Sequence, residues 1–276
     1  QNPEIQDIAD FVGDSLQLAQ QASATPAKVI VSCGVNFMAE SAKILNPDKK
    51  VLMAHKDADC RLANMKDPSF LNKLKAEHPK AEIVCYVNSP AALKAESTIT
   101  CTSANCIKIV EAIPEDKEII FIPDCNIGRW VEYKTGRKLI LPDSFCYVHD
   151  RVSIEEAFAV KKRYPDYTLL VHPECNLEVC KFADVVCSTS QMIDFVARND
   201  KAIIGTELGL FKQLQARYPE KNIVYLSAEM ICEDMKKNSL ENVLNALISE
   251  EYVVNLEKNI IKKTKRSLDR MFEIMR

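Results

Sequence analysis

Short apolar runs, mostly of β-branched residues, alternate along the chain with longer segments in which apolar residues recur every three or four positions. The short runs predict buried strands, and the longer segments predict amphipathic helices. This alternation is typical of α/β proteins, in which helices cover parallel sheets. The expected strands are 28–32, 50–54, 82–87, 98–101, 118–123, 138–141, 168–172, 184–187, 202–205 and 222–226.

The helical segments carry recognisable start signals. Ser153 and Ser239 are expected N-caps, and Glu156 would complete a capping box with Ser153. The chain should end in a solvated amphipathic helix whose Ile260, Leu268 and Met271 face inward. The expected helices are 36–45, 105–112, 153–163, 191–198, 239–248 and 256–276.

Residues separated by 86 positions match repeatedly, which indicates duplicated modules. The same offset places the counterpart of Tyr86 just before Gln1, so we expect a strand with a polar, active-site end ahead of the first given residue. The matched positions are Cys60 with Cys146 and Cys232, Tyr86 with His172, Asn88 with Glu174, and 102–105 with 188–191.

Polar side chains follow the carboxyl ends of the predicted strands. Open parallel sheets bind their ligands beyond these ends. Serine and threonine at the start of a helix suit a phosphate or carboxylate, because free backbone N–H groups point there. His172, beside Glu174, is a candidate for acid–base chemistry, although a lone histidine is more often structural. The residues at these ends are Tyr86, Asn88, Ser103, His172, Glu174, Ser188 and Thr189, with similar turns at 13–15 and 34–36.

Composition narrows the class of protein. Among 276 residues, 47% are hydrophobic, 27% are charged and the net charge is −3, as in an ordinary globular protein. The basic residues are scattered, which disfavours nucleic acid as a partner. No apolar run approaches the ~20 residues that cross a bilayer, and no leader pattern is present, so we expect a cytoplasmic protein that does not contact membranes.

Eleven cysteines indicate metal or redox chemistry in a reducing compartment. The absence of a CxxC pattern excludes zinc fingers and ferredoxin-like runs. Related modules around a pseudo-threefold axis would bring Cys60, Cys146 and Cys232 together. Three thiolates on a [4Fe-4S] cluster leave one iron open to act as a Lewis acid. The alternative is that these cysteines are inherited packing residues.

The other cysteines and one histidine are open to simpler interpretations. His149 either lies next to the cluster or is an ordinary turn residue. Cys175 and Cys180 could form a disulfide or an extra ligand site. Five further cysteines lie in apolar stretches and are expected to pack as small hydrophobic residues: Cys33, Cys85, Cys101, Cys106 and Cys187.

Several longer segments carry a recognisable pattern. They are 4–15, 34–40, 45–49, Tyr86-Val87-Asn88-Ser89, Thr102-Ser103-Ala104-Asn105, Pro123-Asp124-Cys125-Asn126, Cys146-Tyr147-Val148-His149, His172-Pro173-Glu174-Cys175 and Ser188-Thr189-Ser190. Taken together, these segments resemble the quinolinate synthase family, iron–sulfur enzymes of NAD biosynthesis, from one end of the chain to the other. Only Gln1 of the family's His-x-Tyr-Gln stretch is present, and 231–236 departs from the commoner Cys-x-Asn-Met-Lys.

The resemblance implies three homologous αβα modules with parallel sheets in a pseudo-threefold triangle. They would comprise 1–80, completed by the C-terminal helix in 250–276, then 81–165 and 166–250. It also implies condensation of iminoaspartate (iminosuccinate) with dihydroxyacetone phosphate to quinolinate, with release of phosphate and water. L-aspartate oxidase or aspartate dehydrogenase would supply the iminoaspartate.

Site roles carry over by motif. The cluster ligands would be Cys60, Cys146 and Cys232, and the catalytic residues Tyr86, His172 and Glu174. The substrate-binding residues would be Ser15, Tyr86, Asn88, Ser103, His172, Glu174, Ser188 and Thr189. Two alternatives remain at this stage: another [4Fe-4S]-dependent hydro-lyase, or a non-catalytic protein that binds small anions.

Overall fold

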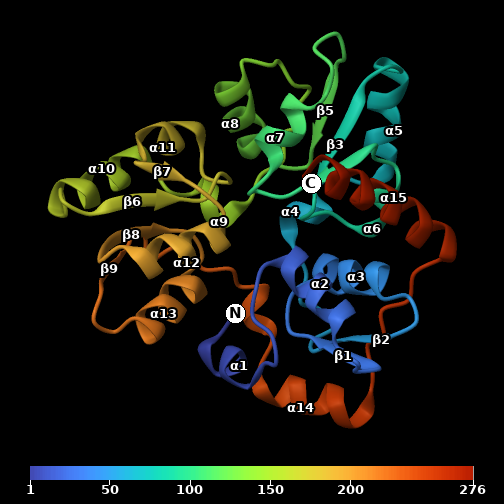
Figure 1. Ribbon diagram of the computed structural model, residues 1–276, viewed down its shortest axis with the longest axis horizontal. Coiled ribbons are helices and arrows are strands. Elements are labelled where there is room, and N and C mark those ends of the chain that lie inside the picture. The colour runs from blue at the N-terminus through green and yellow to red at the C-terminus, as the bar shows by residue number, and fades with distance from the viewer. Residues whose placement is uncertain (276) are drawn as a thin grey trace.

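Three parallel sheets form the framework of the computed structural model, which describes residues 1–275 (Figure 1). Each sheet takes its strands from one stretch of the chain. The first pairs β1 (Val29–Ser32) with β2 (Lys50–Met53). The second has the order β4-β3-β5, with β3 (Glu82–Tyr86), β4 (Ile99–Cys101) and β5 (Ile119–Ile122). The third has the order β7-β6-β8-β9, with β6 (Thr168–Val171), β7 (Val185–Val186), β8 (Lys201–Gly205) and β9 (Asn222–Tyr225).

Helices connect the strands and cover the sheets, so the α/β class is confirmed. Within the described chain no helix is both long enough and apolar enough to cross a membrane. The helices are α1 (Pro3–Ile8), α2 (Ser15–Ala24), α3 (Asn36–Leu45), α4 (Arg61–Asn64), α5 (Pro68–Glu77), α6 (Ala91–Ala95), α7 (Cys106–Glu111), α8 (Cys125–Thr135), α9 (Tyr147–Asp150), α10 (Ile154–Arg163), α11 (Leu177–Phe182), α12 (Thr189–Arg198), α13 (Leu208–Arg217), the 3-10 helix η1 (Met235–Lys237), α14 (Leu240–Ser249) and α15 (Lys258–Met275).

The central strands are buried on both faces, as expected for parallel strands between helix layers. All four residues of β5 are at most 1% exposed. The register continues beyond the strand ends: the Val87 N–H donates to the Cys101 carbonyl, and the His172 N–H donates to the Gly205 carbonyl. Polar residues that follow β3 and β6 are thereby fixed at the carboxyl edges of their sheets.

One predicted strand is wrong. The segment 138–141 makes only a single parallel bridge, between Ile140 and Ile120. The Leu139 N–H donates instead to the Glu132 carboxylate at 2.8 Å, and Pro142 has no N–H to extend the pairing. The other nine predicted strands form within one residue of their expected bounds.

Helix caps follow the sequence signals only in part. Ser239 caps α14 in a capping box with Asn242. Ser153 accepts the Glu156 N–H as expected, but the hydrogen bonds described for Ser153 include no return bond from the Glu156 side chain. Glu156 therefore favours the helix start as a first-turn acid and not as half of a capping box.

The C-terminal segment connects the first and second sheets. Val253 pairs antiparallel with Leu52 at the edge of the first sheet. The chain then enters α15, which packs against α3, α6 and β4 (Figure 1). Leu268 and Met271 are buried there, and Ile260 is partly buried, as the helical pattern predicted.

Candidate functional site

Each of the three cysteines spaced by 86 residues begins a short helical turn. Cys60 and Cys146 are the N-caps of α4 and α9, and Cys232 precedes η1. In all three turns the cysteine carbonyl accepts a hydrogen bond from the N–H four residues later, from Asn64, Asp150 and Lys236 at 3.2, 2.9 and 3.2 Å. The repeat is therefore visible in local backbone structure as well as in sequence.

The residues that follow the three cysteines contact one another. Arg61 forms an ion pair with Glu233 at 2.7 Å, and its guanidinium carbon lies 4.5 Å from the centre of the Tyr147 ring. The Glu233 N–H donates to the Tyr147 hydroxyl at 3.1 Å. Because these three residues touch pairwise, the three cysteine turns converge on one place.

The three cysteines also line adjoining apolar cores. Cys60 and Cys146 pack against one apolar core, and Cys146 and Cys232 pack against a second. Burial, followed by the charges of Glu174 and Cys232, raises the pKa of the Cys60 thiol. Burial, followed by the charges of Glu174 and Cys60, raises the pKa of Cys146. A bound cation would relieve these charge effects.

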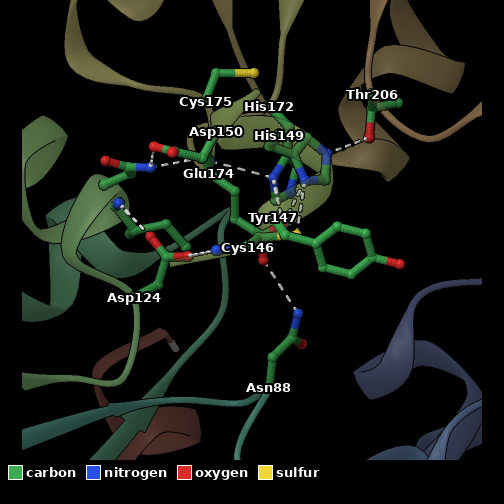
Figure 2. Close-up of polar contacts among 12 residues, drawn as sticks. Asn88, Asp124, Cys146, Tyr147, His149, Asp150, His172, Glu174, Cys175 and Thr206 are labelled. Carbon is green, nitrogen blue, oxygen red and sulfur yellow. Dashed lines mark hydrogen bonds and ion pairs between the residues drawn. The ribbon is translucent and has the colours of Figure 1, made fainter. Parts of the chain in front are cut away.

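A second group of side chains surrounds Cys146 (Figure 2). His149 Nδ1 lies 3.2 Å from Cys146 Sγ and 2.8 Å from Glu174 Oε2. The other Glu174 oxygen, Oε1, accepts a hydrogen bond from Asn88 Nδ2 at 3.2 Å. The rings of His149 and His172 lie 4.9 Å apart between centroids. The ends of β3 and β6 thus meet next to a predicted cluster ligand.

Protonation in this group is set by burial and by close neighbours. Burial lowers the pKa of His172 to about 4, so the ring is neutral at pH 7. Burial alone would raise the pKa of Glu174, but His172, His149 and a hydrogen bond from Tyr86 outweigh it and lower that pKa to about 2. Burial, followed by the charge of Glu174, raises the pKa of the Tyr86 hydroxyl. At neutral pH the site therefore holds a carboxylate, a neutral imidazole and a phenol.

Two buried residues that the sequence reasoning assigned no role support this site. Asp124 caps α8 by accepting the Ile127 N–H at 2.8 Å, and its other oxygen accepts the Cys146 N–H at 3.1 Å. The Asn126 amide donates to the Glu174 carbonyl at 3.2 Å. The signal that could have found Asp124 was local: an aspartate between a buried strand and a helix predicts an N-cap.

The predicted anion-binding turns are partly brought together. Ser188 is the N-cap of α12, which begins at Thr189, and Ser15 begins α2. The Asp14 carboxylate, which caps α2, accepts a hydrogen bond from Ser190 Oγ at 2.7 Å, so these two helix starts are neighbours.

Three further sequence expectations concern Ser103 and the remaining cysteines. Ser103 lies in the turn before α7, and no hydrogen bond described for Ser103 connects it with Glu174. The alternative of a Cys175–Cys180 disulfide is wrong, since both thiols are free and Cys180 Sγ donates to the Cys175 carbonyl at 3.3 Å. The cysteines expected to pack as small residues are buried, except that Cys33 is only partly buried.

The fold and site define an α/β protein in which a largely buried cysteine–histidine–carboxylate group, formed by the start of α9 and the end of β6, suits a metal cofactor. The family model described as "Quinolinate synthetase A protein" matches residues 1–273. The chain therefore belongs to the quinolinate synthetase A family, a family of enzymes of NAD biosynthesis, as the resemblance predicted.

Curated relatives agree along nearly the whole chain. A quinolinate synthase of Caldicellulosiruptor saccharolyticus is 48% identical over 98% of this chain and 90% of the relative. A quinolinate synthase of Alkaliphilus metalliredigens is 45% identical over 99% of this chain and 91% of the relative. Quinolinate synthase 2 of Methanosarcina acetivorans is 43% identical over 98% of this chain and 88% of the relative.

Proposed function

We propose that this chain condenses iminoaspartate with dihydroxyacetone phosphate to form quinolinate, releasing phosphate and water. A [4Fe-4S] cluster held by Cys60, Cys146 and Cys232 would be its cofactor. The observation that carries this proposal is the pairwise contact among Arg61, Tyr147 and Glu233, which joins the three cysteine turns. The proposed setting is the cytoplasm, with L-aspartate oxidase or aspartate dehydrogenase as the supplier of iminoaspartate.

The same contacts support three modules related by a pseudo-threefold axis. Asn88 and Glu174 are 86 residues apart and hydrogen-bonded to each other. Tyr147 and Glu233 are also 86 residues apart and hydrogen-bonded. Equivalent residues of two modules touch only near an axis that relates them. The proposed modules are 1–80 with the C-terminal segment, 81–165 and 166–250.

The chemistry of the donors fits the cluster. All three cysteines are free thiols and only partly buried. Three thiolates hold a cluster while leaving one iron without a protein ligand. When bound, such a cluster supplies a Lewis acid for a hydroxyl or carbonyl oxygen.

The surrounding side chains are suited to the proton transfers that condensation, dehydration and ring closure require. The Glu174 carboxylate is ionised at neutral pH and can accept a proton. The Tyr86 hydroxyl keeps its proton and can donate a hydrogen bond to a substrate oxygen. His172 is neutral, and its Nδ1 accepts the Glu174 N–H at 3.4 Å, which leaves Nε2–H as the donor.

The negative charges of the two substrates require a second set of protein groups, which bind anions. Iminoaspartate carries two carboxylates, and dihydroxyacetone phosphate carries a phosphate. Ser15, Ser188 and Thr189 lie at the starts of α2 and α12, where backbone N–H groups favour anions. We assign the same role to Ser103, in the turn before α7. Asn88 holds one oxygen of Glu174 and so orients the carboxylate.

The test is anaerobic reconstitution followed by iron, sulfide and quinolinate assays. We expect about four iron and four sulfide per chain, and quinolinate formed from the two substrates. Cys60→Ser, Cys146→Ser and Cys232→Ser should each lose the iron, whereas the controls Cys33→Ser and Cys101→Ser should retain it. Equal iron in all five variants would refute the ligand assignment.

The same assays separate the two alternatives. A cluster-loaded protein that dehydrates another hydroxy acid but forms no quinolinate would be a different hydro-lyase. A folded protein that stays free of iron after reconstitution would be a non-catalytic anion-binding protein.

A further inference from the structure

We propose that Cys146, His149 and Glu174 form a mononuclear site for a divalent transition-metal cation, distinct from the three-cysteine site and exclusive with it. Such a site does not depend on the proposed condensation. It uses two residues, His149 and Glu174, that are not cluster ligands, and it needs neither Cys60 nor Cys232.

The distances among the three donor atoms are close to those around a single ion. Cys146 Sγ, His149 Nδ1 and a Glu174 oxygen all lie within 4.8 Å of one another. Two of the three separations are already short, at 3.2 Å and 2.8 Å. Ligand atoms around a tetrahedral zinc ion are about 3.3 to 3.6 Å apart, given usual metal–ligand lengths. Small side-chain rotations therefore suffice to enclose an ion.

The protein already fixes the orientation of these donors. Cys146 and His149 are three residues apart across the start of α9, and the His149 N–H donates to the Cys146 carbonyl at 3.2 Å. His149 Nε2 lies 2.9 Å from Thr206 Oγ1. A hydroxyl can donate or accept, so Thr206 can stabilise the tautomer that leaves the Nδ1 lone pair facing the ion. Asn88 holds the second oxygen of Glu174.

Charge and donor type restrict the class of ion. A thiolate and a carboxylate together neutralise a divalent cation, which is important in a buried site where His149 and Glu174 are 6% and 3% exposed. Sulfur and imidazole donors favour zinc, ferrous iron or cobalt(II) over magnesium or calcium. On binding, the Cys146 thiol would release its proton to solvent. The fourth position remains open for water.

Cys146 would serve both sites, so the two metal states compete. The cluster requires Cys60, Cys146 and Cys232, whereas the single ion requires Cys146, His149 and Glu174. A chain that has bound zinc is therefore expected to resist cluster assembly until the zinc is removed by a chelator.

The experiment titrates the anaerobic, cluster-free protein with cobalt(II) and follows absorption. We expect about one cobalt per chain, with thiolate-to-cobalt charge transfer and the visible bands of a tetrahedral ion. His149→Ala should weaken cobalt binding by about 10- to 100-fold or more, while reconstituted iron and sulfide stay at the wild-type level. Cys60→Ser is the matched control, since it should keep the cobalt spectrum and lose the cluster.

Two results would overturn the proposal. One is the absence of any thiolate–cobalt band in the folded wild-type protein. The other is a band that survives His149→Ala but disappears in Cys60→Ser, which would place the ion among the three cysteines. Circular dichroism identifies variants that fail to fold, and His149→Gln provides a second variant of similar size. Failure of the proposed condensation would instead appear in the quinolinate assay and leave the cobalt result intact.

Discussion

Among single residues, Lys94 is a buried charge outside the candidate site. It is 0% exposed, and its ammonium donates to Ser41 Oγ at 3.0 Å and to the Val87 carbonyl at 3.2 Å. Burial lowers its pKa to about 8, although the charge of Glu40 partly offsets the effect. Because Val87 lies between Tyr86 and Asn88, Lys94 connects α3 with the strand end that carries two predicted site residues.

This buried lysine should give stability a distinctive pH dependence. Between about pH 8 and 10.5, the folded chain has lost the Lys94 proton and the unfolded chain still holds it. The contribution of Lys94 to the free energy of unfolding should therefore rise with pH across this window, by about 3 kcal/mol. Lys94→Met lacks this contribution, so the difference in free energy of unfolding between the wild type and Lys94→Met should change by that amount across the window.

Urea unfolding of both proteins between pH 7.5 and 10.5 measures the difference. Lys108→Met removes a solvent-exposed lysine from α7 and serves as the control, because it should follow the wild-type curve. Parallel curves for the wild type and Lys94→Met would contradict the assignment of a lowered pKa.

Glu174 and Tyr86 allow catalysis to be separated from cluster binding. Neither is a proposed iron ligand, so Glu174→Gln and Tyr86→Phe should reconstitute with wild-type iron and sulfide. Loss of the proton acceptor or donor should lower kcat by about 100-fold or more. Steady-state assays beside an iron assay on the same samples provide the measurement. Iron loss in either variant would show that the residue acts structurally.

At the scale of elements, sequence pattern predicted the strands well because each is a short apolar run between turn signals. The failure at 138–141 arose because strand formation also needs a partner for each N–H, and Leu139 donates to Glu132 instead. The 86-residue offset identified equivalent positions. It did not reveal that Asn88 and Glu174 touch, because contact depends on how the sheets are placed.

The candidate site was predicted where its signals were local, and missed where they were not. Cysteines, serines and polar strand ends are readable from the chain. The interpretation of His149 stayed open because its neighbours Glu174 and Thr206 are 25 and 57 residues away in sequence. Asp124 offered a local N-cap signal, but its link to the site is not local, since its second partner is the Cys146 N–H, 22 residues later.

At the scale of the whole molecule, the Arg61–Tyr147–Glu233 contact joins three stretches of chain at their cysteine turns. Arg61 also pairs with Asp234 at 3.0 Å, and the Arg151 guanidinium carbon lies 5.2 Å from the centre of the Tyr147 ring. Arg61 and Glu233 are largely exposed, with side chains 55% and 70% accessible. Exposed ion pairs add little to the free energy of unfolding. We therefore expect this contact to hold the three cysteine turns in position relative to one another.

Arg61→Ala should therefore weaken retention of the cluster more than it weakens the fold. With the guanidinium gone, the turns of Cys60 and Cys232 lose their direct ion pair, and thiolates that move apart release iron more readily. We expect a near-unchanged Tm for the cluster-free protein and faster loss of iron to a chelator from the reconstituted protein. Lys265→Ala removes an exposed ion pair with Asp269 on α15 and is the matched control. Equal iron-release rates in the two variants would show that the convergence of the three turns does not depend on this contact.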